Sequence, residues 1–202
     1  GVRNAQWLDA DRLLISARED DTQHEDALEE AKDHTRVVED TTLYHPVRLF
    51  TVDTESQAVE RVSSNTFPIT EFAADPTGRY VVYAVDPSPV DADARNQYRQ
   101  YLLDLQSGSR TEIFAKQYFD PSAFQWTRDG SGFYATDEYS SDPEHEGAGI
   151  SLLYYFDIQS RSYQKVDLDA GDRGLGTGGF AVTTNGVHAQ IANGPRMTPR
   201  FY

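Results

Sequence analysis

Five histidines and no cysteine limit the chemistry that this 202-residue chain can carry. Without cysteine there is no thiolate nucleophile, no disulfide and no Cys-ligated zinc or iron–sulfur site. No histidine pair has the His-x-x-x-His or His-Glu-x-x-His spacing of a metal site; the histidines are His24, His34, His45, His145 and His188. His145 lies between Glu144 and Glu146, a grouping that attracts divalent cations, but a solvated polar loop explains it more simply.

Aspartate pairs and a glycine-rich stretch are the other motifs with chemical potential. Asp91-x-Asp93 and Asp167-x-Asp169 resemble calcium ligands but lack the glycine and terminal glutamate of a calcium loop. The glycine-rich stretch 174–179 leads into a strand-like segment, whereas a phosphate-binding loop leads into a helix, so we interpret it as a connection. The Gly-x-Ser-x-Gly nucleophile elbow does not occur in the sequence. We therefore expect no catalytic residue, no cofactor and no metal in this chain.

The charge of the chain excludes several partners. Lys plus Arg is 18 and Asp plus Glu is 33, which gives a net charge of −15, and only Lys32, Lys116 and Lys165 are lysines. This acidity argues against nucleic acid and against an anionic membrane surface, and no apolar stretch is long enough for membrane insertion. Adaptation to high salt and ordinary acidity both explain it. Residues 1–7 lack a signal segment, which leaves cytoplasm and periplasm open.

Two interleaved series of residues show that the chain is built from repeats. An apolar strand precedes each of Asp53, Asp104 and Asp157, which are 51 and 53 residues apart, and a second strand follows a short turn. Gly78, Gly132 and Gly186 are 54 residues apart. Each period holds four strand-like segments separated by Asp- and Gly-containing turns, and four antiparallel strands in about fifty residues form one propeller blade.

The repeats predict an all-β fold, a β-propeller of four-stranded antiparallel blades. The chain holds about 3.7 repeats of roughly 54 residues, so we expect part of a larger propeller of six to eight blades. The expected blades are 1–67, 68–120, 121–173 and an incomplete blade, 174–202, that ends after about two strands. A helical insertion, 19–43, interrupts the first blade.

Three long connections vary far more than the strands. In the insertion 19–43, Thr22-x-x-Glu25 fits a capping box and predicts a helix over 23–33, with Leu28 and Ala31 facing the body. The other two connections are 87–96 and 140–149. Loops on a rigid scaffold often carry binding function, although solvated connectors explain these segments as well.

The turn motifs and the insertion resemble known families. Asp75-Pro76-Thr77-Gly78 and Asp129-Gly130-Ser131-Gly132 resemble the Trp-Ser-Pro-Asp-Gly unit of bacterial propellers, although that unit is nowhere intact. It occurs in Tol-system proteins and in prolyl oligopeptidase-family serine peptidases. Glu29-Glu30-Ala31-Lys32, followed by an acidic linker and residues 48–53 (RLFTVD), is similar to the acylaminoacyl- and dipeptidyl-peptidase-like members of the second group.

The resemblance implies that the chain is the substrate-gating propeller portion of a serine peptidase. Its partners would be a peptide substrate and a C-terminal α/β-hydrolase domain, absent from this chain, that carries the catalytic Ser, His and Asp. In dipeptidyl-peptidase relatives a glutamate pair on a short propeller helix holds the substrate's amino terminus, and Glu29 and Glu30 match it here. An exposed helix face explains the pair equally well. The alternatives are a non-catalytic Tol-like propeller that binds other proteins and a propeller enzyme of another class.

Overall fold

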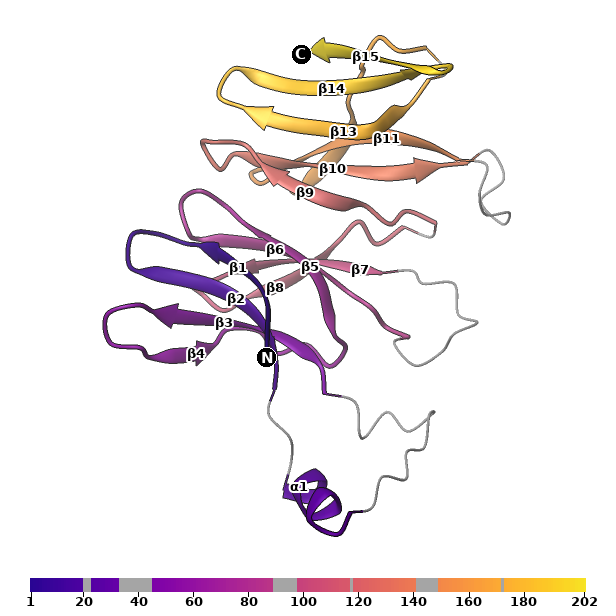
Figure 1. Cartoon of the computed structure of the whole chain (residues 1–202). Coiled ribbons are helices and arrows are strands. Elements are labelled where there is room, and N and C mark those ends of the chain that lie inside the picture. The colour runs from indigo at the N-terminus through magenta and orange to yellow at the C-terminus, as the bar shows by residue number, and fades with distance from the viewer. Residues whose placement is uncertain (20–22, 33–44, 89–97, 117, 141–148, 172) are drawn as a thin grey trace. The chain divides into compact units, whose positions relative to one another are not determined.

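A computed structural model describes residues 1–19, 23–32, 45–88, 98–116, 118–140, 149–171 and 173–202 (Figure 1). The chain divides into two compact units. Unit 1 comprises residues 1–70 and 84–98, and unit 2 comprises residues 71–83 and 99–202. No helix among the described residues has the length and apolar character needed to cross a membrane.

Unit 1 contains a four-stranded antiparallel sheet of order β1-β2-β3-β4. Its strands are β1 (Val2–Trp7), β2 (Arg12–Arg18), β3 (Val47–Asp53) and β4 (Val59–Arg61). Leu14, Val47 and Leu49 are fully buried at its centre. The helix α1 (Gln23–Glu30) ends three residues before the expected position, and the capping residue Thr22 lies outside the described residues. Leu28 is half-buried, but Ala31 is exposed, so the expectation that Ala31 packs on the body is wrong.

Unit 2 contains most of a second sheet, of order β5-β6-β7-β8. Its strands are β5 (Ile69–Ala74), β6 (Tyr80–Val85), β7 (Arg99–Asp104) and β8 (Arg110–Ile113). The third sheet has seven strands. Four of them are β9 (Ser122–Trp126), β10 (Gly132–Tyr139), β11 (Ile150–Asp157) and β12 (Ser162–Lys165), and the other three are β13 (Leu175–Thr183), β14 (Gly186–Asn193) and β15 (Arg196–Phe201). The pair Ser151–Leu175 joins β11 to β13. The all-β fold with four-stranded antiparallel sheets is therefore confirmed.

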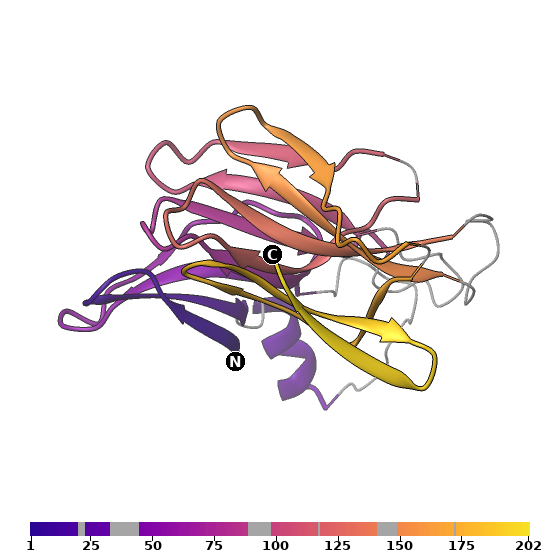
Figure 2. The same cartoon turned by 90° about the horizontal axis from the view of Figure 1, so that it is seen from above.

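The last repeat has three strands where the sequence analysis expected about two. Asn193 pairs with Arg196, and Gly194 between them has a φ of +60°, which reverses the chain into β15. An Asn-Gly dipeptide between strand-like segments is a hairpin signal, so this turn was readable from the sequence. Figure 2 shows the two hairpins β13–β14 and β14–β15 at the carboxyl end of the chain.

The repeated aspartates have the same structural role in all three sheets. Asp53 Oδ1 accepts the N–H of Ser56, Asp104 Oδ1 that of Ser107, and Asp157 Oδ1 that of Ser160. The residue four places after each aspartate is left-handed: Gln57 at φ 60°, Gly108 at 69° and Arg161 at 54°. The side chain thus replaces a backbone acceptor and the following residue turns the chain, which explains the constant spacing.

Two side chains at repeated positions connect neighbouring repeats within unit 2. The Glu71 carboxylate on β5 accepts the N–H groups of Ala123 and Phe124 at 3.1 and 3.0 Å. Gln125, 54 residues later on β9, accepts the N–H of Val182 and donates to the carbonyl of Phe180, both at 3.0 Å. Each side chain holds the first strand of the next repeat in place, and we call this arrangement the sheet clip.

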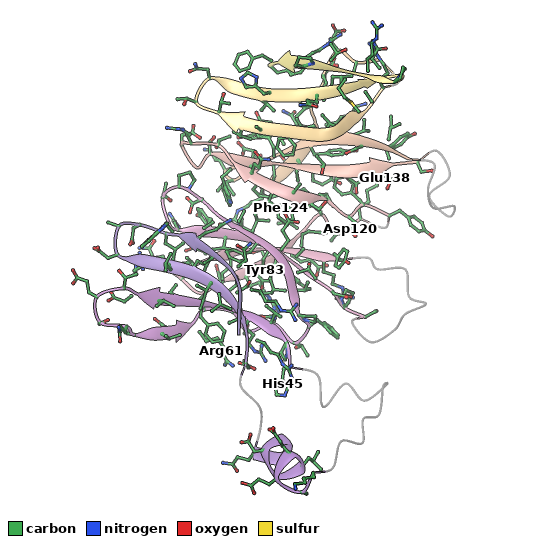
Figure 3. The ribbon with its side chains drawn as sticks, viewed as in Figure 1. His45, Arg61, Tyr83, Asp120, Phe124 and Glu138 are labelled. Carbon is green, nitrogen blue, oxygen red and sulfur yellow. The ribbon has the colours of Figure 1, made fainter. Side chains whose placement is uncertain are left out.

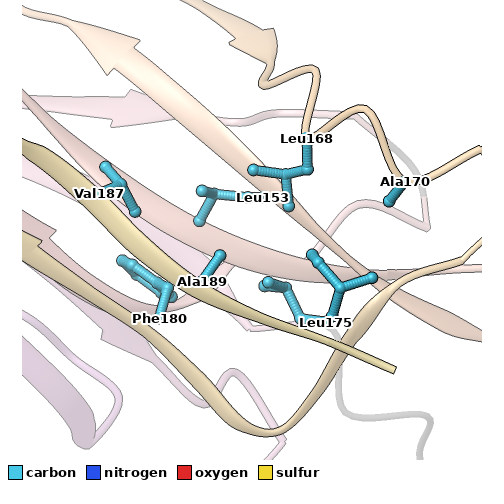
Figure 4. Close-up of a cluster of buried hydrophobic side chains, with 8 residues drawn as sticks. Leu153, Leu168, Ala170, Leu175, Phe180, Val187 and Ala189 are labelled. Carbon is cyan, nitrogen blue, oxygen red and sulfur yellow. The ribbon is translucent and has the colours of Figure 1, made fainter. Parts of the chain in front are cut away.

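The cores of unit 2 lie between its sheets. One cluster, drawn in Figure 4, joins β11, the β12–β13 connection, β13 and β14; it contains Leu153, Leu168, Ala170, Leu175, Phe180, Val187, Ala189 and Ile191. A second cluster is aromatic and centres on Phe133 and Phe156, whose rings stack at 5.0 Å. Gly132 is needed beside it, because a Cβ there would lie 2.2 Å from the Phe156 carbonyl oxygen.

Candidate functional site

The predicted glutamate pair lies on an exposed helix. Glu29 and Glu30 are the last two residues of α1, and both are exposed. The N–H of Lys32 bonds to the carbonyl of Glu29, and Lys32 has a φ of 55°, which ends the helix. Adjacent residues of a helix point in different directions, so the two carboxylates diverge from one another. The amino-terminus-binding role of this pair stays a prediction.

The weaker motifs of the sequence do not gather into a site among the residues that the structure describes. His145, Asp91 and Asp93 lie outside them. Asp167 Oδ1 accepts the N–H of Asp169, and the Asp169 carboxylate pairs with Arg200 at 3.3 Å. Within the described residues no three His, Asp or Glu side chains form a cluster suited to a metal ion. The glycine-rich stretch begins in the β12–β13 connection and continues into β13.

The base of the insertion in unit 1 is fixed by ion pairs. Glu19 Oε1 lies 2.8 Å from Arg48 Nε on β3 and 3.0 Å from a side-chain nitrogen of Arg61 on β4. Figure 3 labels Arg61. Burial raises the pKa of Glu19, but the bonds to the two arginines outweigh it and the net pKa is lowered. The chain therefore leaves β2 at a fixed position before it enters the insertion.

A second group of residues lies at one end of unit 2, where the β8–β9 link (residues 114–121) meets the ends of β7 and β10. Phe114 and Tyr118 have left-handed backbones, with φ of 57° and 58°. Lys116 donates its N–H to the carbonyl of Phe114 and accepts that of Phe119. This compact path places the Phe119 ring 4.9 Å from Tyr154 on β11 and 4.8 Å from Tyr163 on β12.

A buried carboxylate lies beside this aromatic group. Asp137 on β10 is only 9% exposed, and its Oδ1 accepts the N–H of Asp120 at 2.9 Å. The Asp120 carboxylate accepts a bond from Gln100 on β7, which is itself fully buried. These bonds tie the link to two sheets. Figure 3 shows Asp120 on the link and Glu138 beside the end of β10. We call Asp137, Tyr154, Phe119 and Lys116 the link site.

The electrostatics of the link site differ from those of an ordinary surface carboxylate. Burial raises the pKa of Asp137, and Glu138 raises it further, against the lowering effects of backbone N–H groups and Lys116. Burial also raises the pKa of Tyr154, as do Asp137, Tyr163 and Tyr139. A desolvated carboxyl beside a phenol can hold a proton or a cation. Within the described residues, no ion pair within 4.0 Å joins Asp137 to a basic side chain.

The link site was not predicted from the sequence, although one signal for it was present. Phe133, Ala135 and Asp137 alternate along β10 and lie on its buried face. The corresponding positions 54 residues before and after Asp137 are Tyr83 and Ile191, and both are fully buried. A charged residue at a repeated core position is therefore the feature that distinguishes Asp137 from its counterparts.

The comparisons with known proteins establish the fold. No family model and no curated protein matches the sequence. The tricorn protease matches 94% of this chain with a TM-score of 0.65 and 11% identity, over 15% of that chain. The Pyrococcus horikoshii acylaminoacyl peptidase matches all of it with a TM-score of 0.58 and 6% identity, over 32% of that chain. TolB from Acinetobacter baumannii matches all of it with a TM-score of 0.53 and 12% identity, over 43% of that chain.

These similarities confirm the resemblance inferred from the repeats at the level of the fold. The β-propeller domain of the Trilobed protease from Pyrococcus furiosus also matches. The chain spans less than half the length of each of the three proteins above. With its four-stranded antiparallel sheets, the chain has the fold of part of a β-propeller, of the kind found in propeller-containing peptidases and in TolB.

Proposed function

We propose that this chain is the substrate-gating propeller portion of a serine peptidase of the prolyl oligopeptidase family. The observation that carries the proposal is the shared fold with propeller-containing peptidases, together with a sequence that has no nucleophile elbow of its own. The Ser, His and Asp of acyl transfer would lie on an α/β-hydrolase domain outside this chain. The propeller would then admit peptides and exclude folded proteins.

In this proposal the blades are residues 1–67, 68–120, 121–173 and 174–202, and the helical insertion 19–43 reaches the substrate. Glu29 and Glu30 would hold the free amino terminus of a peptide, because a carboxylate attracts an ammonium group at short range. Both side chains are exposed, so a ligand can reach them. An acetylated peptide lacks the charge and would lose this interaction.

The experiment uses the full-length product of the gene. A fluorophosphonate probe should label its active serine, and absence of labelling would count against the peptidase. Glu29→Gln with Glu30→Gln should raise KM for peptides with a free amino terminus and leave acetylated peptides unchanged. Glu55→Gln with Glu60→Gln, which alters two exposed glutamates of unit 1, is the matched control. Equal kinetics for both double variants would exclude the glutamate pair while leaving the peptidase proposal standing.

The second candidate is a Tol-like propeller that binds other proteins without catalysis. The match to TolB over the whole of this chain favours it. The gene distinguishes the two candidates, because a downstream region of hydrolase size with Gly-x-Ser-x-Gly supports the peptidase. A full-length product that ends within the propeller, carries an export signal and does not react with the probe supports the Tol-like alternative.

A further inference from the structure

The link site contains a carboxylate that is shielded from water and that forms no ion pair with the residues that the structure describes. Asp137 is 9% exposed, and within the described residues it accepts hydrogen bonds from backbone N–H groups and interacts with charges at longer range. A buried charge without a counter-ion is costly, and proteins usually supply a partner. The corresponding positions of the repeat accept uncharged residues, since Tyr83 and Ile191 fill them. A carboxylate kept at such a position is suited to an external cation.

Two aromatic residues lie near the same carboxylate: Tyr154 is two residues beyond the strand partner of Asp137, and Phe119 precedes Asp120, whose N–H bonds to it. Phe119 packs edge-on against Tyr154 at 4.9 Å, and the Tyr154 phenol interacts electrostatically with Asp137 and Tyr139. Aromatic faces and phenol oxygens beside a carboxylate are the groups that recognise ammonium ions. The ring of Phe119 already interacts with one such ion, because Lys116 Nζ lies 6.0 Å from its centroid.

Lys116 is held in place by the backbone of the link. Its N–H and carbonyl are both bonded within the link, between the left-handed residues Phe114 and Tyr118. It is one of three lysines in a chain of net charge −15. Its ammonium lies at the outer limit of a cation–π contact and lowers the pKa of Asp137 without forming an ion pair. This is the position of a weakly bound internal ligand that a stronger one can displace.

We propose that the link site binds the ammonium group of an external amine, with Lys116 as its internal competitor. Asp137 supplies the charge, Phe119 and Tyr154 supply the aromatic wall, and the exposed side chain of Lys116 moves away from the Phe119 ring when the ligand enters. The carboxylates of Asp120 and Glu138 make the surroundings unfavourable for an anion. The proposal concerns unit 2 alone, so it stands whether or not a peptidase domain follows. The ammonium could come from a peptide's amino terminus or from a lysine side chain.

The test is an NMR titration of the 202-residue chain that follows the ring signals of Phe119 and Tyr154. The probes are alanyl-alanine amide for an α-ammonium, Nα-acetyl-lysine methylamide for a side-chain ammonium, and N-acetyl-alanine amide as the uncharged control. Each is titrated at fixed ionic strength into the wild type and the variants Lys116→Ala, Asp137→Asn and Lys165→Ala. Lys165 is exposed on β12 opposite Tyr154 and serves as the matched lysine control.

We expect a charged probe to bind roughly two- to fivefold more tightly to Lys116→Ala, which is the fold-change of an exposed cation–π contact. Lys165→Ala should bind as the wild type does. Asp137→Asn should weaken binding at least about tenfold, the loss expected for one charged partner. The charged probe that responds identifies the source of the ammonium. Equal affinities across all four proteins would show that the amines bind the acidic surface non-specifically and would overturn the proposal, as would an equal response to the uncharged probe.

Discussion

The sheet clip makes a prediction about substitutions that keep shape and change only hydrogen-bond polarity. Glu71 presents two acceptors to two backbone donors, the N–H groups of Ala123 and Phe124. Gln125 presents one acceptor and one donor, which match the N–H of Val182 and the carbonyl of Phe180. Glu71→Gln would place an amide N–H against a backbone N–H. Gln125→Glu would place a carboxylate oxygen against a backbone carbonyl.

The magnitude follows from the bond that is lost. A buried polar group left without its partner costs roughly 1–3 kcal/mol, and a bond to a charged acceptor is worth more than a neutral one. Glu71 and Gln125 are half-buried, which favours the lower part of that range. We expect each substitution to lower the free energy of unfolding by about 1–2 kcal/mol. For a chain of this size, that corresponds to a fall in Tm of about 2–8 °C.

Only one of the two variants should gain stability relative to the wild type at low pH. A glutamate at position 125 faces a carbonyl, so its protonated form, which can donate, is favoured in the folded protein and its pKa is raised. Stability from such a group is present below the unfolded pKa of about 4.3 and is lost as pH rises. Gln125→Glu should therefore approach wild-type stability near pH 4. Glu71→Gln introduces no titrating group and should gain no stability at low pH.

The assay is urea unfolding followed by Trp fluorescence and circular dichroism, at pH 7.5 and pH 4. Trp126 is a local probe, since it lies on β9 beside Gln125 and its Nε1 donates to the carbonyl of Ala73 on β5. Glu112→Gln and Gln164→Glu, on exposed strand positions, are the charge-matched controls. The reasoning is refuted if Glu71→Gln or Gln125→Glu unfolds with the controls at pH 7.5.

Three further predictions concern the turns and the titrating carboxyls. A left-handed backbone costs a residue with a side chain about 1–2 kcal/mol, and the greater chain entropy that glycine loses on folding offsets part of this difference. Gln57→Gly should therefore stabilise unit 1 by about 0.5–1 kcal/mol, and Gly108→Ala should destabilise unit 2 by about 1 kcal/mol. A Cβ at Gly108 meets no atom within 4 Å, so urea unfolding would report the backbone alone, and Gln57→Ala should be neutral. The pKa of Asp137 is raised in the folded protein, so ionisation of its carboxyl lowers the stability of the protein once the pH is above the ordinary pKa of an aspartate. The Asp137→Asn variant should therefore unfold at a higher urea concentration than the wild type at pH 7, but not at pH 3. The Asp129 pKa is about 2, because the N–H and hydroxyl of Ser131 and the hydroxyl of Thr127 favour the carboxylate. Its contribution is therefore present above pH 4 and lost towards pH 2, and Asp129→Asn should show a shallower loss of stability over that range in the same assay.

The repeated part of the fold could be predicted from the sequence because the same residues form the same turns and strands in each repeat. The aspartates at 53, 104 and 157 recur since each makes the same turn, and their spacing reveals the strands on either side. The β14–β15 hairpin was missed because the repeat series ends there, although Asn193-Gly194 carried the signal. Of the two glycines in the turn motif Asp129-Gly130-Ser131-Gly132, Gly130 has the left-handed backbone, whereas Gly132 is required by the close approach of the Phe156 carbonyl.

The candidate sites could not be predicted in the same way, because their residues occur once. Glu29 and Glu30 lie in an insertion that no other repeat shares, so a family resemblance alone singles them out. Lys116 belongs to the β8–β9 link, in which Phe114 and Tyr118 have left-handed backbones. Neither residue is a glycine or an asparagine, so the sequence gives no sign of this conformation. The contact between Phe119 and the β11–β12 strands joins positions 35 and 44 residues apart, which no local pattern reports.

A repeat protein offers its own internal comparison, and Asp137 shows how that comparison separates scaffold from site. Three copies of one position carry Tyr83, Asp137 and Ile191, all buried on the second strand of a sheet. The same backbone with two uncharged residues, one a tyrosine and one an isoleucine, shows that the position does not require a charge for folding. Ionised Asp137 is disfavoured by burial, so its presence costs stability that an apolar residue would not. The same alignment applied to the sheet clip gives Glu71, Gln125 and Gly179, where the first two make equivalent bonds and therefore serve the scaffold. A residue that differs from its counterparts in the repeat is not by itself evidence of a binding site. Asp137 differs from its counterparts and also lowers stability, and this combination is why we expect binding at the link site of unit 2.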